Sequence, residues 1–182
     1  MRKIYLAMAL SLTVLAAGCG TSDKDTTTAA PTQEATQAPE VDAVTTASIV
    51  NDAASFEKAI SADGTWIIAA LNDINTSNEL VLDGEFQNSR GETQRKIALY
   101  AQDENRNVTA RYTLTAPKLT VKSPAAMIVN GTFVGDVYVE TTDFQLIGAT
   151  VDGNIIFASE EAKAGFTMDA DSKVTGTQEV TK

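Results

Sequence analysis

The side chains that could do chemistry in this sequence are mainly arginines and carboxylates. The chain has no histidine and a single cysteine, which excludes a Ser-His-Asp triad, a Cys-His pair, an imidazole-bound zinc and an internal disulfide. Four arginines, Arg90, Arg95, Arg106 and Arg111, lie in one polar stretch over residues 87–111. This stretch is a candidate substrate loop and its arginines are candidate ligand contacts, although a solvated loop is the simpler interpretation.

Metal binding and paired-carboxylate catalysis have no specific signal in the sequence. Asp169 and Asp171 are two positions apart, but calcium prefers about six to eight oxygen ligands, so this pair is too small to predict a site. With 24 acidic residues, carboxylate pairs arise by chance, and a glycosidase pair cannot be recognised. We therefore predict no metal and no cofactor, and we assign no catalytic residue.

Among the aromatic residues, Tyr138 is the best candidate for a surface contact with a ligand. Its two neighbours are valines, so on a strand the tyrosine would point to the opposite, outward face. Trp66 precedes two isoleucines and is expected in the core.

The N-terminus carries a charged and then an apolar segment that ends at the only cysteine. Arg2 and Lys3 precede an apolar run over residues 4–17, which is shorter than the about 20 residues of a spanning helix. Residues 15–19, Leu-Ala-Ala-Gly-Cys, resemble the lipobox of bacterial lipoproteins, although that family prefers leucine three positions before the cysteine. The resemblance implies a signal peptide over residues 1–18. It also implies a diacylglycerol on Cys19 and a lipid-anchored location outside the cytoplasm. An ordinary secretory signal and an uncleaved anchor are the alternatives.

Composition separates a tether from a folded domain. Residues 20–46 are rich in Thr, Ala, Gln and Pro and have no aromatic residue, so we expect residues 19–46 to form a lipidated, disordered tether that spans roughly 30 Å. The formal charge of −10 argues against nucleic-acid binding, which needs cations to replace phosphate counterions. The folded domain is expected over residues 47–182.

The folded domain is predicted to be β-rich after one N-terminal helix. Residues 48–61 have an apolar stripe with helical spacing, and Asn51 or Ser55 could cap the helix. Short strands bounded by turn residues follow, and no second long helix is evident. The expected strands cover residues 66–71, 80–82, 97–99, 112–114, 119–121, 127–129, 137–139, 144–147, 155–157 and 166–168.

The strands repeat with a period of about 20 residues, which is typical of a solenoid. Gly135, Gly153 and Gly176 recur at equivalent places and are expected at corners, where a positive φ is tolerated. Residues 52–84 resemble the N-terminal cap and first coil of pectate-lyase-like right-handed parallel β-helices, and the coils at 135–157 also resemble bactofilins. We therefore predict an all-β fold, a short right-handed parallel β-helix with one capping helix. The alternative is an antiparallel β-sandwich.

These observations favour a non-enzymatic binding or structural module at the cell envelope. The implied partners are membrane lipid through Cys19 and an envelope polysaccharide or protein. One alternative is a carbohydrate-binding or polysaccharide-lyase-like protein, which would need an arginine opposite converging carboxylates. A second alternative is a self-assembling scaffold, since the C-terminal end has no evident cap.

Overall fold

The computed structural model describes residues 47–181, in which strands predominate and both helices are short. Neither helix in this range is long and apolar enough to cross a membrane. The helices are α1 (Ala53–Ile60) and α2 (Glu160–Gly165). The strands are β1 (Ala47–Val50), β2 (Ile67–Ala70), β3 (Ile74–Asn75), β4 (Leu80–Leu82), β5 (Arg95–Ala98), β6 (Tyr100–Gln102), β7 (Val108–Arg111), β8 (Thr113–Val121), β9 (Ala126–Val129), β10 (Thr132–Val139), β11 (Gln145–Ile147), β12 (Thr150–Asp152), β13 (Ile155–Phe157), β14 (Thr167–Met168), β15 (Lys173–Val174) and β16 (Gln178–Val180).

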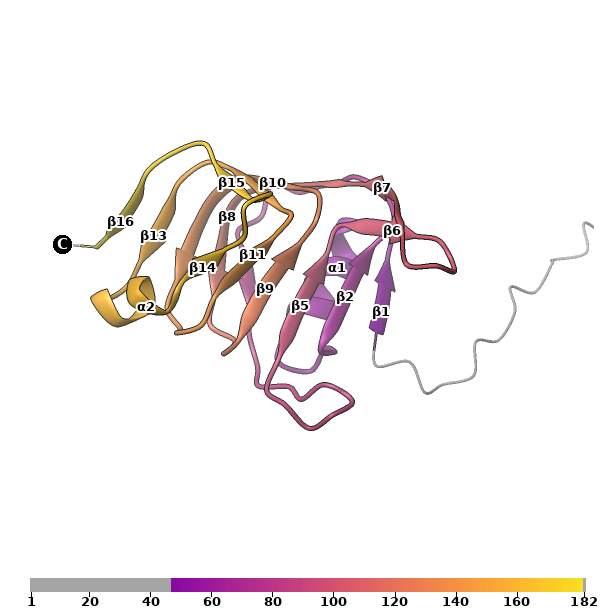
Figure 1. The fold of residues 1–182 in the computed structure, drawn as a ribbon, viewed down its shortest axis with the longest axis horizontal. Coiled ribbons are helices and arrows are strands. Elements are labelled where there is room, and N and C mark those ends of the chain that lie inside the picture. The colour runs from indigo at the N-terminus through magenta and orange to yellow at the C-terminus, as the bar shows by residue number, and fades with distance from the viewer. Residues whose placement is uncertain (1–46, 182) are drawn as a thin grey trace, which may run out of the picture. The chain divides into compact units, whose positions relative to one another are not determined.

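The first sheet, called sheet A below, has the strand order β1-β2-β5-β9-β11-β14, and every pair in it is parallel. These strands lie side by side in Figure 1. Ile68, Ile97, Ile128 and Leu146 are register partners from one strand to the next. Because parallel neighbours need a crossover between them, the chain returns to the same end of sheet A before each new strand.

The second sheet, called sheet B below, is also parallel and centres on the two long strands β8 and β10. The strand β8 pairs with β3 and β4 on one side, while β10 pairs with β12 and β13 on the other. The strands β15 and β16 then pair with β12 and β13. Parallel pairing in both sheets shows that the antiparallel sandwich, the alternative drawn from the sequence, is wrong.

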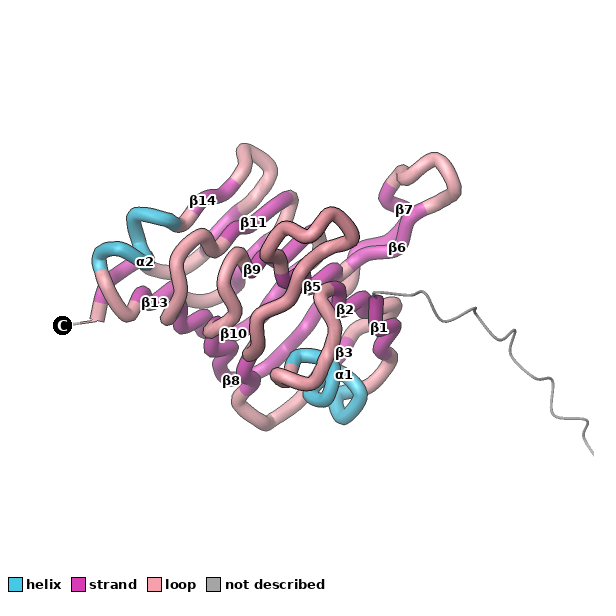
Figure 2. Tube along the Cα trace, turned by 90° about the horizontal axis from the view of Figure 1, so that it is seen from below, coloured by secondary structure: helices cyan, strands magenta, loops and turns pink. Residues whose placement is uncertain are grey.

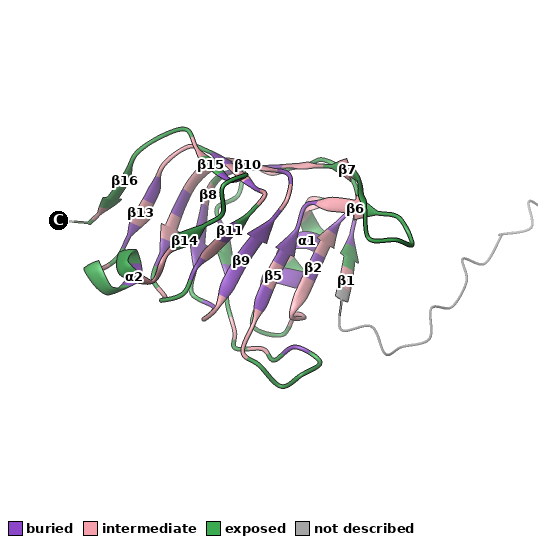
Figure 3. Cartoon of the chain, in the orientation of Figure 1, coloured by how far each residue is buried: buried purple, intermediate pink, exposed green. Residues whose placement is uncertain are grey.

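The core is a single cluster formed by the inward-facing residues of both sheets and of α1. Burial alternates along the strands, as in β4 and β13, where the outer two residues are buried and the middle one is not. The buried positions form continuous bands across neighbouring strands in Figure 3. This pattern of one buried face is the one that the alternation of apolar residues predicts.

The repeated glycines stack at a bend in sheet B. The strand β10 has a register shift between Val134 and Asp136, and Gly135 at that point has a φ of 135°. Gly153 has a φ of 158°, and a Cβ on it would overlap the carbonyl oxygen of Gly135. Gly176 packs on Gly153 in the same way, but without a positive φ. The equivalence of the three glycines is thus confirmed, and the positive φ holds for the first two.

The N-terminal region differs in detail from the expected helix over residues 48–61. Residues 47–50 form β1, because they pair with β2, and α1 begins at Ala53. The cap is neither Asn51 nor Ser55 but Asp52, whose carboxylate accepts a hydrogen bond from the Ser55 N–H at 2.8 Å. The expected apolar stripe is confirmed, since Phe56, Ala59 and Ile60 are buried.

Two further elements interrupt the sheets. The strands β6 and β7 form an antiparallel hairpin that projects from the body in Figure 2. The short helix α2 follows β13, and Phe166 at its end packs on Phe144 and Phe157 with ring centroids 5.8 and 5.4 Å apart. The sequence indicated a polar loop over residues 87–111 but not its hairpin, and it did not indicate α2.

Candidate functional site

A groove lies over the outer face of sheet A and has a volume of about 780 Å³. Its floor comes from outward positions of neighbouring strands. Lys96, Met127 and Gln145 are register partners across β5, β9 and β11, and Val129 pairs with Ile147 two positions further along. The residues that line it are Trp66, Asn88, Ser89, Arg90, Gln94, Lys96, Arg106, Met127, Val129, Gln145 and Ile147.

Two insertions form the walls of this groove, which is called the sheet A groove below. The loop over residues 83–94 immediately precedes β5, and the hairpin β6–β7 follows it. Each contributes an arginine, Arg90 from the loop and Arg106 from the tip of the hairpin. The groove therefore lies between two segments attached to the opposite ends of one strand.

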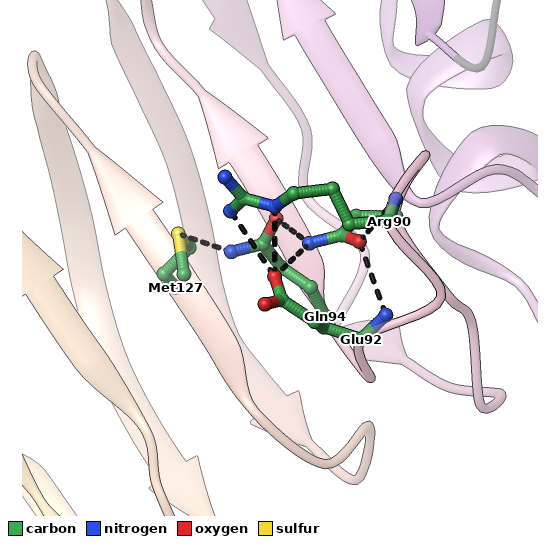
Figure 4. A network of polar contacts seen from close by, with 5 residues as sticks. Arg90, Glu92, Gln94 and Met127 are labelled. Atoms are coloured by element: carbon green, nitrogen blue, oxygen red, sulfur yellow. Dashed lines mark hydrogen bonds and ion pairs between the residues drawn. The ribbon is translucent and has the colours of Figure 1, made fainter.

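A polar network fixes the loop against sheet A (Figure 4). The Asn88 Oδ1 accepts hydrogen bonds from the Arg90 and Glu92 backbone N–H groups at 2.9 and 3.1 Å. The Asn88 Nδ2 donates to Glu92 Oε2 at 2.9 Å and to Gln94 Oε1 at 3.4 Å. The Gln94 amide in turn donates to the Met127 sulfur at 3.9 Å. These bonds link the loop to the floor of the groove.

The groove is positively charged within an acidic protein. Its lining includes Arg90, Lys96 and Arg106 and contains no aspartate or glutamate. Arg90 forms an ion pair with Glu92 at 3.1 Å, but both side chains are exposed, which makes the pair weak. Burial lowers the pKa of Lys96. Arg106 is exposed and has a φ of 66°, an uncommon value for a residue other than glycine.

Trp66 is not in the core, contrary to the expectation from its apolar neighbours. The residue is half-buried and lines the sheet A groove, while its Nε1 is covered and has no hydrogen-bond partner among the described residues. It lies one residue before β2, where the sequence gives no alternation to indicate which face it takes.

The structure places the predicted contact residues in different environments. Arg90 and Arg106 share the sheet A groove. Arg111 lies on β7 and donates to the Asn130 side chain at 3.3 Å, in a separate polar groove of about 470 Å³. Tyr138 lies half-buried on the outer face of sheet B, between two buried valines.

Arg95 cannot contact a ligand in this structure, so the prediction for this residue is wrong. Its side chain is wholly buried beneath sheet A, because the alternation in β5 directs Arg95 and Ile97 inward and Lys96 outward. The Arg95 Nη2 donates to the carbonyl oxygens of Ala59 and Ser61 at 2.8 and 2.9 Å. It acts as an internal partner for the end of α1.

Metal ligands do not gather in the part of the chain that the structure describes, where no group of three or more Asp, Glu, His or Cys side chains could hold an ion. Asp169 is occupied within the fold. It accepts hydrogen bonds from Ser172 Oγ at 2.6 Å and from the Gly148 N–H at 3.0 Å, which lower its pKa. The predicted lipidation site, Cys19, and the expected tether lie outside the described residues.

Sequence reasoning missed Lys96, Gln94 and Gln145 as groove residues. Their roles depend on the register that brings β5, β9 and β11 together, and no local motif records that register. Comparisons of the chain with protein-family models, curated proteins and solved structures found no match.

Proposed function

We propose that this chain is an extracytoplasmic, lipid-anchored binding module that holds its ligand in the sheet A groove and carries out no reaction on it. The observation behind the proposal is the groove, in which three cations and three side-chain amides from separate segments meet over one sheet. Converging carboxylates, which the lyase-like alternative needs, are missing from the groove lining.

The proposed scaffold is a right-handed parallel β-helix with α1 covering its first coil. Parallel pairing from strand to strand in both sheets supports this proposal. Crossovers between parallel strands of one sheet are right-handed in about 98% of cases, which supports the proposed hand. The helix α1 packs on β1, β2 and β4 at the N-terminal end, as a cap would.

The proposed anchor is a diacylglycerol on Cys19, supported by the lipobox-like residues 15–19. Each buried acyl CH₂ contributes about 0.8 kcal/mol, so two chains attach a protein stably. Cys19→Ala should therefore move the protein from the membrane to the soluble fraction of cells. If its distribution matches that of the unaltered protein, the anchor is not the lipid.

Binding in the groove is tested with immobilised protein and a panel of peptides, acidic polysaccharides and neutral polysaccharides. The groove variant combines Lys96→Gln and Arg106→Gly, and the matched control combines Lys122→Gln and Lys163→Gln, which remove the same charge from exposed sites outside the groove. Binding that weakens in the groove variant alone supports the proposal. If every ligand binds the groove variant and the control equally well, the proposal is refuted.

A further inference from the structure

The charge of the sheet A groove contrasts with the charge of the whole chain. The chain has 24 acidic and 14 basic residues, yet the groove lining has three cations and no carboxylate. Within the described residues, Lys96 and Arg106 form no ion pair, and Glu92 partly neutralises Arg90 from outside the lining. A local positive region on an acidic body attracts an anionic group to one place and repels it elsewhere.

Apolar side chains contribute to the floor of the groove beside Lys96 and Gln145. They are Met127, Val129 and Ile147, and Val129 and Ile147 are register partners on β9 and β11. Ile147 is 38% exposed, whereas Met127 and Val129 are 7% exposed. Ile147 therefore offers a contact for an aliphatic side chain of an extended ligand.

The Gln145 amide suits a peptide backbone. It lies in the row of Lys96 and Met127, and a primary amide has donors and an acceptor that can pair with both the N–H and the C=O of an extended chain. The amides of Asn88 and Gln94 instead bond to one another, to Glu92 and to Met127, and so hold the loop. Trp66 is the one aromatic residue of the groove lining, and aromatic rings are the surfaces on which ligand rings stack. The set of residues thus favours a peptide over a sugar polymer.

We infer that the sheet A groove binds an acidic segment of a partner protein in an extended conformation. This inference rests on the proposed function and specifies its ligand. An aliphatic side chain of the segment lies against Ile147. Its carboxylates lie against Lys96 on the floor and Arg106 on the hairpin wall.

The experiment is a selection from a random, surface-displayed peptide library on the purified full-length protein. Peptides in which Asp or Glu accompanies aliphatic residues should be enriched. The affinity of the best peptide should fall about tenfold in the Lys96→Gln and Arg106→Gly variant, since each exposed ion pair contributes up to about 1 kcal/mol. It should be unchanged in the Lys122→Gln and Lys163→Gln control and should weaken as salt increases. Arg106→Gly leaves a residue that tolerates the φ at that position, and thermal unfolding of each variant separates loss of binding from loss of fold.

Three outcomes overturn the inference. Enriched peptides without an acidic bias would show that charge does not select the ligand. The ligand would be a sugar polymer if polygalacturonate or a neutral glucan binds in place of peptides and binds less well to the groove variant. The proposed function would then stand. If every probe binds the groove variant and the control equally well, the proposed function is refuted as well.

Discussion

Replacement of Arg95 tests whether a buried cation completes the end of α1. The guanidinium is wholly buried and donates to the carbonyl oxygens of Ala59 and Ser61, which belong to the last turn and the C-cap of the helix. These carbonyls carry the negative end of the helix dipole. The guanidinium carbon also lies 3.8 Å from the centroid of the Phe86 ring.

The magnitude follows from opposing contributions. Burial, partly opposed by the charge of Asp83, lowers the pKa of Arg95 to about 10, a cost to the charged form of about 3 kcal/mol. Two hydrogen bonds from a charged donor contribute about 1.5–3 kcal/mol each, and the contact with Phe86 adds about 1 kcal/mol. The sum of these contributions is about 1–4 kcal/mol, and the Nε and Nη1 donors, which are buried without a partner among the described residues, place it toward the lower end. Arg95→Met keeps most of the packing but leaves two buried carbonyls without a donor, so we expect a loss of about 2 kcal/mol. Arg95→Ala adds a cavity, and we expect about 4 kcal/mol.

The assay is urea unfolding followed by circular dichroism. Lys96→Met is the matched control, because Lys96 is the next residue on β5 and faces outward; its free energy of unfolding should change by less than about 0.5 kcal/mol. Arg95→Met should be clearly less stable than this control and more stable than Arg95→Ala. A methionine variant as stable as the unaltered protein would show that desolvation of the cation cancels its hydrogen bonds, and the reasoning would be refuted.

Three further predictions concern the turns and the groove. Gly153→Ala should lower the free energy of unfolding by more than about 3 kcal/mol, because the new Cβ overlaps backbone atoms. The control Gly91→Ala, also at positive φ but in open space, should lower it by about 1 kcal/mol. Equal losses in the two variants would contradict the steric argument. Arg106→Gly should raise the melting temperature by a few degrees, because it removes about 1 kcal/mol of backbone strain. It should also weaken groove binding, because it removes a positive charge. An unchanged melting temperature would contradict the strain at this position. The pKa of Glu92 is lowered first by its hydrogen bond from Asn88 and then by Arg90, so the ionised Glu92 stabilises the loop fully above pH 4.5, and this stabilisation is lost as the pH falls below that value. The pH dependence of amide hydrogen exchange in the loop measures this loss. The dependence should be smaller in Asn88→Ala.

Much of the sheet framework can be predicted from the sequence, where alternating apolar residues stand between turn residues. The strands Leu80–Leu82 and Ile155–Phe157 were expected with the bounds that the structure shows. The strands β15 and β16 were missed, because each has a single partly buried residue and gains its extended form from pairing with β12 and β13. Short strands of this kind are set by their neighbours, and local sequence carries little information about them.

The candidate site was predicted in part, and the reason for each error is physical. The polar stretch 87–111, a candidate substrate loop from the sequence, supplies Arg90 and Arg106 of the groove lining, and their contact with a ligand stays a prediction. The sequence Arg95-Lys96-Ile97 contained the signal that Arg95 faces inward, because alternation places it on the face of Ile97. Buried arginine is rare, and the polar surroundings of residues 87–111 favoured an exposed side chain. The carbonyls that accept its hydrogen bonds belong to α1, more than thirty residues earlier.

The strand β5 explains why the sheet A groove and the N-terminal end of the fold depend on each other. Its outward residue Lys96 lies on the floor of the sheet A groove, while its inward residue Arg95 holds the end of α1 and contacts Phe86. The Phe86 carbonyl accepts a hydrogen bond from the Gln94 N–H at 2.9 Å, so the same phenylalanine closes the loop that carries Arg90. The repeated strands provide a regular surface, and insertions at the two ends of one strand make a site on it. A buried cation at this strand is therefore placed where it orders the loop from beneath, at a position that no ligand reaches.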